Sequence, residues 1–424
     1  MEWNGGKVMF ALGVLVIIAT IIAIVKRYEA KLVLFIAGLV MTMISGQFNL
    51  AFETFTNSMV NKGLVLVICS VMGFAFVMKK TECDIHLVHL LADHIKKYVI
   101  LLIPSAVIIT WLVNIALPTA AGCAAAVGIV LIPTLIKAGV HPVIAASCIL
   151  AGTWGSVLNP GTVHNPFIAK IANTDPVSIV LGHTFAALVG VLVIAIALTI
   201  VAYVKKENTG YVSEAMEEDN NPCFQVNYVK AFIPVLPLLL LVLGSKQINV
   251  IPSMSVLQAM LIGTFVAFIV TRVSPSKITK EFCEGMGNGY GSVVTLIVAA
   301  AVFVAGMQSL GIVDSLIEYM KNSSGMAKIA AAWGPFLITV LSGSGDAVSL
   351  AFNGAITPFA ADFGLEPSNL GSLAYLSGGL GRSMCPVAPV SIICAQLAGV
   401  ETMDMAKRNA IPAILALLAV MFIL

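Results

Sequence analysis

The chain has 424 residues, of which 59% are hydrophobic and only 10% are charged, and its mean hydropathy is +1.00. Soluble globular proteins carry about 25% charged residues, so the composition excludes a soluble chain and indicates an all-α polytopic membrane protein surrounded by lipid. The net charge of +2 gives no sign of a nucleic-acid partner.

Ten apolar segments are long enough to cross a hydrocarbon layer of about 30 Å. No cleavage pattern follows the first of them, so we expect it to be a retained span. Two more apolar stretches are too long for one span and are interrupted in the middle, so each is predicted to be a re-entrant hairpin or two ordinary spans. The ten spans are residues 8–25, 30–44, 63–78, 142–173, 179–204, 230–244, 254–271, 291–310, 368–398 and 408–424, and the two stretches are residues 98–138 and 326–362.

Basic residues are enriched on the cytoplasmic side of membrane proteins. If both long stretches are hairpins, sixteen basic residues face the cytoplasm and five face out, with both termini outside. Two spans in place of each hairpin give the same orientation, so charge does not separate these alternatives. The sixteen are Lys26, Arg27, Lys31, Lys79, Lys80, Lys96, Lys97, Lys137, Lys205, Lys206, Lys230, Arg272, Lys277, Lys280, Lys407 and Arg408, and the five are Lys7, Lys62, Lys246, Lys321 and Lys328.

An internal repeat divides the chain into two halves. The spacing F-x-x-x-M-x-N occurs twice, 227 residues apart, each time before a span with a glycine-rich start. An odd number of predicted crossings separates equivalent elements, which predicts inverted repeats of the kind found in secondary transporters. The two copies are Phe55, Met59 and Asn61, and Phe282, Met286 and Asn288.

These landmarks predict a domain plan. Residues 1–29 form a first span and its cytoplasmic turn, residues 205–228 form a charged cytoplasmic linker, and two repeats occupy the rest. Each repeat contains a hairpin and a broken span. The first repeat is residues 30–204, with hairpin 98–138 and broken span 142–173, and the second is residues 229–424, with hairpin 326–362 and broken span 368–398.

Glycine and proline interrupt four apolar segments, at residues 117–122, 152–166, 342–346 and 378–386. Non-helical backbone at membrane depth survives only where protein or a wet cavity satisfies its polar groups. Each break also exposes helix N-termini, which suit an anion. The pattern predicts a site for a small anion at Thr119, Asn159, Thr162, Ser342, Gly343, Ser344, Gly345, Asp346, Arg382 and Ser383, with Thr153, Ser156, His164 and Asn165 as weaker candidates.

Two ionisable residues lie within these breaks. A charge at the bilayer centre is costly unless it is paired, and the planar fork of Arg382 matches a carboxylate through two hydrogen bonds. Arg382 could therefore bind a substrate carboxylate, or it could pair with Asp346 and cap carbonyl groups. Asp346 in turn could bind a coupling ion, Na⁺ or H⁺, or act as a counter-charge.

The runs at residues 342–347 and 379–387 resemble those of the anaerobic C4-dicarboxylate carriers of the Dcu-C type, within the ion transporter superfamily. The resemblance covers most of the chain and is densest after residue 284. It implies a bacterial inner-membrane, elevator-like carrier of succinate, fumarate, malate or aspartate, which could form a homodimer. Asp346 stands where the family pattern leads us to expect an amide, and residues 118–121 hold fewer hydroxyls than the family's first tip.

Other functions fit the sequence less well. Residues 343–346 match the G-x-G-D signature of intramembrane aspartyl proteases, but that chemistry needs two carboxylates and the other aspartates fall in predicted loops or interfacial stretches. The chain is therefore expected to be a carrier without a cofactor rather than an enzyme. The alternative is a cation antiporter, or a carrier of another organic or inorganic oxyanion. Arg382 favours an anion, whereas Asp346 keeps a cation open.

Overall fold

The structure is a computed structural model that describes residues 2–26, 28–60, 62–92, 101–211, 225–244, 250–315 and 324–424. Within these ranges the chain folds into helices and turns, with no β-strand. The expectations placed on Arg27, Asn61, Lys96, Lys97, Lys246 and Lys321, and on residues 98–100 and 212–224, lie outside the described residues.

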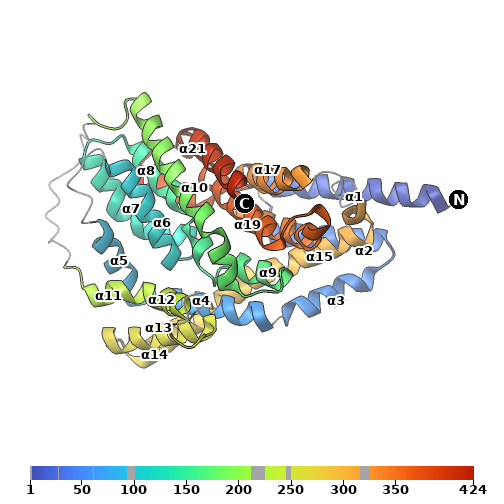
Figure 1. Cartoon of the computed structure of the whole chain (residues 1–424), viewed down its shortest axis with the longest axis horizontal. Coiled ribbons are helices and arrows are strands. Elements are labelled where there is room, and N and C mark those ends of the chain that lie inside the picture. Colours follow the sequence, from blue (N-terminus) through green and yellow to red (C-terminus); the bar gives the residue numbers. More distant parts are fainter. Residues whose placement is uncertain are drawn as a thin grey trace.

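The first half has its two breaks where the sequence predicted them. Most of its helices are apolar, and the chain is interrupted between α6 and α7 and again between α8 and α9 (Figure 1). The helices are α1 (Glu2–Val25), α2 (Ala30–Ile44), α3 (Phe48–Met59), α4 (Lys62–Lys80), α5 (Cys83–Ala92), α6 (Leu102–Ala116), α7 (Ala120–Lys137), α8 (Pro142–Gly152), the 3₁₀ turn η2 (Gly155–Leu158), α9 (His164–Ile171) and α10 (Pro176–Val204).

The second half of the chain is also helical. It consists of α11 (Tyr228–Phe232), the 3₁₀ turn η3 (Ile233–Val235), α12 (Leu236–Leu243), α13 (Val256–Thr271), α14 (Pro275–Asn288), the π-helical turn η4 (Gly289–Val294), α15 (Thr295–Ser309), α17 (Ser324–Ser342), α18 (Gly345–Ala355), the 3₁₀ turn η5 (Thr357–Phe363), α19 (Pro367–Ser383), α20 (Pro389–Ala398) and α21 (Thr402–Ile423).

The helix starts recur at a nearly constant offset. Helices α7, α8 and α9 begin 225 residues before α18, α19 and α20, respectively. Packing pairs recur as well: α8 packs on α6 and α7, as α19 packs on α17 and α18, while α10 lies along α21 in the middle of the molecule (Figure 1).

Long apolar helices and small residues build this packing. Five helical segments are long and apolar enough to cross a membrane, namely Ala120–Lys137, Pro176–Val204, Pro275–Ser309, Gly325–Ser342 and Thr402–Ile423. Helix α2 packs closely on α15, where Gly38 lies against the Val302 backbone and Gly306 lies against Gly38. Because lipid tails are as apolar as leucine, such close backbone approach is a main source of helix association in membranes.

Two elements were not expected from the sequence. Residues 48–59 and 275–288 form the amphipathic helices α3 and α14, and α14 runs through the π turn η4 into α15 as one segment of 35 residues. Both helices contain too many polar residues to be recognised as spans. The repeated F-x-x-x-M spacing falls on them, because Phe55 and Met59 lie in α3 while Phe282 and Met286 lie in α14.

Candidate functional site

All four interruptions meet at one cavity of about 630 Å³. One wall is formed by residues 118–121 and 342–346, which are the turns that follow α6 and α17. Another is formed where the second helix of each broken pair begins, by residues 161–164 and by Val387, Pro389 and Val390, together with Ser156, Tyr375 and Arg382. Segments more than 180 residues apart in the sequence thus share one polar space.

Four helix N-termini border this cavity. They belong to α7, α9, α18 and α20, and in none of them does the N-cap side chain form a capping hydrogen bond. The first N–H groups of a helix have no partner within the helix, and the helix dipole places partial positive charge there. The cavity therefore suits a small anion through its backbone alone.

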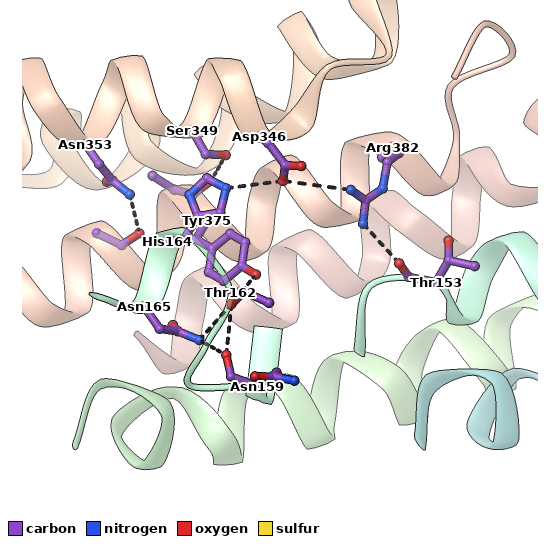
Figure 2. A network of polar contacts seen from close by, with 12 residues as sticks. Thr153, Asn159, Thr162, His164, Asn165, Asp346, Ser349, Asn353, Tyr375 and Arg382 are labelled. Atoms are coloured by element: carbon purple, nitrogen blue, oxygen red, sulfur yellow. Dashed lines mark hydrogen bonds and ion pairs between the residues drawn. The ribbon is translucent and has the colours of Figure 1, made fainter. Parts of the chain in front are cut away.

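An ion-pair network lies at the end of α18 that faces the cavity (Figure 2). Asp346 Oδ1 lies 3.2 Å from His164 Nε2 and 3.9 Å from Arg382 Nη1. The Asp346 side chain is 54% exposed, whereas the His164 side chain is only 1% exposed. Arg382 Nη2 also donates a hydrogen bond of 3.0 Å to the Thr153 carbonyl oxygen. Arg382 thus contacts both the counter-charge and the broken backbone of the first half.

Tyr375 contacts this network through His164. Its ring stacks on His164 with the centroids 4.0 Å apart and the planes 20° apart, and its hydroxyl donates to Thr162 Oγ1 at 3.1 Å (Figure 2). Tyr375 and Arg382 are seven residues apart on α19, which places both on one face of the helix. One face of the second-half helix therefore contacts the break of the first half.

Buried amides hold the non-helical backbone of the first break. Asn165 Nδ2 donates to the carbonyl oxygens of Val157 and Asn159 at 2.9 and 2.8 Å. Asn114 Oδ1 accepts from Ser156 N at 2.8 Å, while its Nδ2 donates to the Leu117 carbonyl oxygen at the same distance. These contacts supply the partners that irregular backbone requires at membrane depth.

His183 supports the same break from α10. This side chain is fully buried, and its ring nitrogens lie 3.0 Å from the Val157 carbonyl oxygen and 2.9 Å from Ser372 Oγ. Ser372 belongs to α19, so His183 ties α10 to both broken segments. Both ring nitrogens are engaged and the side chain is buried, so His183 supports the packing of the break and does not line the cavity.

The opposite wall of the cavity comes from other helices. Tyr28 and Glu29 line it from the α1–α2 connection, and Asn288 and Ser292 line it at the π turn η4. The carbonyl oxygen of Gly291, within that turn, accepts a hydrogen bond of 3.2 Å from Lys31 Nζ. π-helical turns within longer helices are frequent at functional sites.

The predicted site residues divide into two groups. Those that line the cavity are Thr119, Ser156, Thr162, His164, Ser342, Gly343, Ser344, Gly345, Asp346 and Arg382. The others are buried behind its wall, where they hold backbone or helix groups, namely Thr153, Asn159, Asn165 and Ser383.

Sequence reasoning missed several residues of this region. Tyr375 could have been found from the sequence, because it lies two helical turns before Arg382 in an apolar segment and a buried phenol usually has a hydrogen-bond partner. No comparable signal marks Asn114 or His183, which stand alone in apolar runs.

Comparison with known proteins bears on this geometry. Residues 9–424 match the family described as the C4-dicarboxylate anaerobic carrier, DcuC. The chain belongs to this family. As a DcuC-family protein it is a multi-pass membrane carrier rather than an enzyme. The resemblance read from residues 342–347 and 379–387 is thereby confirmed.

Individual relatives are similar over long stretches. An uncharacterised transporter of Haemophilus influenzae is 40% identical over 272 residues, which cover 62% of this chain and 98% of that relative. The anaerobic C4-dicarboxylate transporter DcuC of Escherichia coli K12 is 25% identical over 451 aligned residues, covering 96% of this chain and 94% of that relative.

A solved structure shares the fold. It is that of MtrF from Neisseria gonorrhoeae, which represents a class of antimetabolite efflux pumps. The TM-score is 0.64 at 11% identity, and the match covers 88% of this chain and 82% of that chain. At this identity the likeness concerns the fold alone.

Among the residues that the structure describes, no group of three metal-binding side chains comes together.

Proposed function

We propose that this DcuC-family protein is a secondary active carrier of C4-dicarboxylates such as succinate, fumarate, malate and aspartate. The observation that carries the proposal is the meeting of four uncapped helix N-termini with Arg382 at one cavity. Family membership and the named E. coli relative support the same substrate class.

The charges of the site suit a dianion with two separated carboxylates. Each helix N-terminus contributes the equivalent of about +0.5 charge, and two of these termini come from each half of the chain. One carboxylate would bind Arg382, whose Nη1 is held only loosely by Asp346 at 3.9 Å. The other would accept from backbone N–H groups at the tips that begin with Ala120 and Gly345.

The proposed mechanism is elevator-like alternating access. Residues 98–173 and 326–398 would move as one transport unit against a scaffold formed by the remaining helices. The cavity lies between these two groups, because its walls come from the four breaks on one side and from the α1–α2 connection, α4 and η4 on the other. A ligand bound there would change its access when the unit moves.

The inverted relation of the two halves is part of the proposal. Its support is the recurrence of helix starts and packing pairs described above. In this arrangement α6–α7 and α17–α18 would be re-entrant hairpins that enter the membrane from opposite sides. We place the carrier in the bacterial inner membrane, in line with its bacterial relatives, and expect a homodimer that meets through the scaffold.

Counterflow in proteoliposomes tests the substrate class. Vesicles loaded with succinate would be diluted into labelled succinate, fumarate, malate, aspartate, citrate or acetate. We expect uptake of the C4 acids and little uptake of the others. Active, correctly inserted protein that takes up no C4 acid would contradict the proposal. Exchange of a labelled cation in its place would support the antiporter alternative centred on Asp346, and exchange of another oxyanion would support a different anionic substrate.

A further inference from the structure

Asp346 stands out because it is an acidic group in a site built for an anion. Its side chain is 54% exposed, and the cavity that it lines also contains the four uncapped helix N-termini. Its Oδ1 faces His164 and Arg382, as Figure 2 shows. A dianion bound beside Arg382 would therefore lie within a few ångströms of a second negative charge.

His164 contacts Asp346 from the first break. Its Nε2 lies at hydrogen-bond distance from Asp346 Oδ1, its ring is stacked on Tyr375, and its Nδ1 is buried without a hydrogen-bond partner. The Asp346 side chain is 54% exposed and the His164 side chain 1%, so the carboxylate is the partner that a proton from the cavity reaches first.

We infer that Asp346 is the proton-coupling residue of the carrier, taking up one proton with each dianion that binds, while His164 positions its carboxylate. This inference rests on the proposed function. The dianion and the ionised carboxylate repel each other, and a proton on Asp346 removes that repulsion. Binding of proton and binding of substrate therefore favour one another by the same free energy.

The other charged and titratable groups around the pair fit this assignment. From α19, Arg382 keeps its positive charge and remains the partner of the substrate carboxylate, and the Tyr375 hydroxyl donates to Thr162. From the α1–α2 connection, Glu29 lines the cavity, but it lies 3.7 Å from Lys31 and caps α2 through Leu32 N. The contacts of Glu29 thus engage both of its carboxylate oxygens, whereas those of Asp346 engage Oδ1. Asp346 is therefore the acid of the cavity with an oxygen left for a proton.

The proton balance of the cycle is simple. On the side where substrate loads, one proton from water adds to the Asp346 carboxylate as the dianion binds. On the other side the dianion leaves and the same proton returns to water. No proton passes to the substrate, and the ionised carboxylate holds Arg382 when the site is empty.

The ratio of protons to succinate moved tests this inference. Proteoliposomes containing a pH-sensitive dye would receive labelled succinate, and initial proton and succinate fluxes would be measured together. We expect about one proton per succinate for the wild type and about none for Asp346→Asn, whose amide imitates the protonated acid. Because a ratio is measured, it stays meaningful when the rate of a variant falls.

Two further variants separate the roles of the neighbours. His164→Gln, which keeps a donor for Asp346 Oδ1, is expected to retain about one proton per succinate. Glu29→Gln serves as the matched control, since it neutralises the other acid of the cavity and should also leave the ratio unchanged. A ratio that drops in His164→Gln and persists in Asp346→Asn would overturn the assignment.

A second measurement covers a variant that no longer transports. Succinate binding to detergent-purified protein in buffers of different ionisation enthalpy reports the protons taken up on binding. We expect about one for the wild type and none for Asp346→Asn. Net succinate uptake into empty vesicles without proton movement, or accumulation driven by a sodium gradient, would overturn the inference and leave the proposed function standing. Absence of counterflow would overturn the proposed function itself.

Discussion

Arg382 and Thr153 join the two halves of the protein at the point where both are broken. The guanidinium of Arg382, at the end of α19, donates a hydrogen bond of 3.0 Å to the carbonyl oxygen of Thr153, just after α8. The same guanidinium faces the cavity and lies 3.9 Å from Asp346. The alternatives raised for Arg382 by its sequence position are therefore compatible: one nitrogen holds backbone while the other remains available for a carboxylate.

Removal of this charge should abolish most transport. Hydrogen bonds to charged groups contribute about 1.5–3 kcal/mol, so Arg382→Gln is expected to lower the initial rate of succinate counterflow about 10- to 100-fold. Arg382→Lys should restore little, because an ammonium cannot hold a carbonyl and a carboxylate in one plane. Arg272→Gln, an exposed arginine after α13, is the control and should transport normally. If Arg382→Gln and Arg382→Lys transport succinate as fast as the control Arg272→Gln, Arg382 does not contribute to the substrate site.

Tyr375→Phe separates stacking from hydrogen bonding. The variant keeps the ring on His164 and loses only the hydroxyl that donates to Thr162. A neutral hydrogen bond contributes about 0.5–1.5 kcal/mol, so KM for succinate should rise about 2- to 10-fold. Tyr203→Phe, on the exposed face of α10, should leave KM unchanged. An unchanged KM in Tyr375→Phe would mean that the Thr162 contact does not shape the substrate site.

The sequence predicted the meeting of the four breaks because glycine and proline within apolar segments are strong local signals. Thr119, Ser344 and Arg382 line the resulting cavity, and their contact with substrate stays a prediction. The sequence could not tell which polar side chains of a break turn inward. Outside a helix no period fixes side-chain direction, so Asn159 could not be distinguished from Thr162, although Asn159 holds buried backbone. The helices α3 and α14 were not predicted, because their hydropathy is too low to indicate a span.

Gly155 is required by close approach of two backbones. A side chain at this position would collide with the carbonyl oxygen of Trp111 on α6, so Gly155→Ala must displace η2 or α6. Overpacking of this kind costs about 1–3 kcal/mol, and we expect a lower melting temperature in detergent and slower counterflow. Gly182→Ala is the matched control, since nothing lies within 4 Å of a side chain there. A Gly155→Ala protein as stable as the control would contradict the packing described for the first break.

His183 should contribute to stability rather than to substrate contact. His183→Leu leaves the Val157 carbonyl oxygen and Ser372 Oγ without this buried partner. The expected loss is about 1–3 kcal/mol in the free energy of unfolding, measured by chemical or thermal denaturation of the purified protein. The neighbouring Thr184→Val loses only a bond within its own helix and should change little. If His183→Leu alters KM without altering stability, the histidine acts on the substrate site instead.

The most direct test of the central claim asks whether a dicarboxylate occupies this cavity. Ser344, at the start of α18, lines the cavity, whereas Ser383 is buried behind it. In a background without native cysteines, Ser344→Cys should react with a small thiol reagent, succinate should slow the reaction and acetate should not, and Ser383→Cys should react poorly in every condition. Modification of Ser344→Cys at one rate with and without succinate, in protein that still performs succinate counterflow, would show that the substrate binds elsewhere.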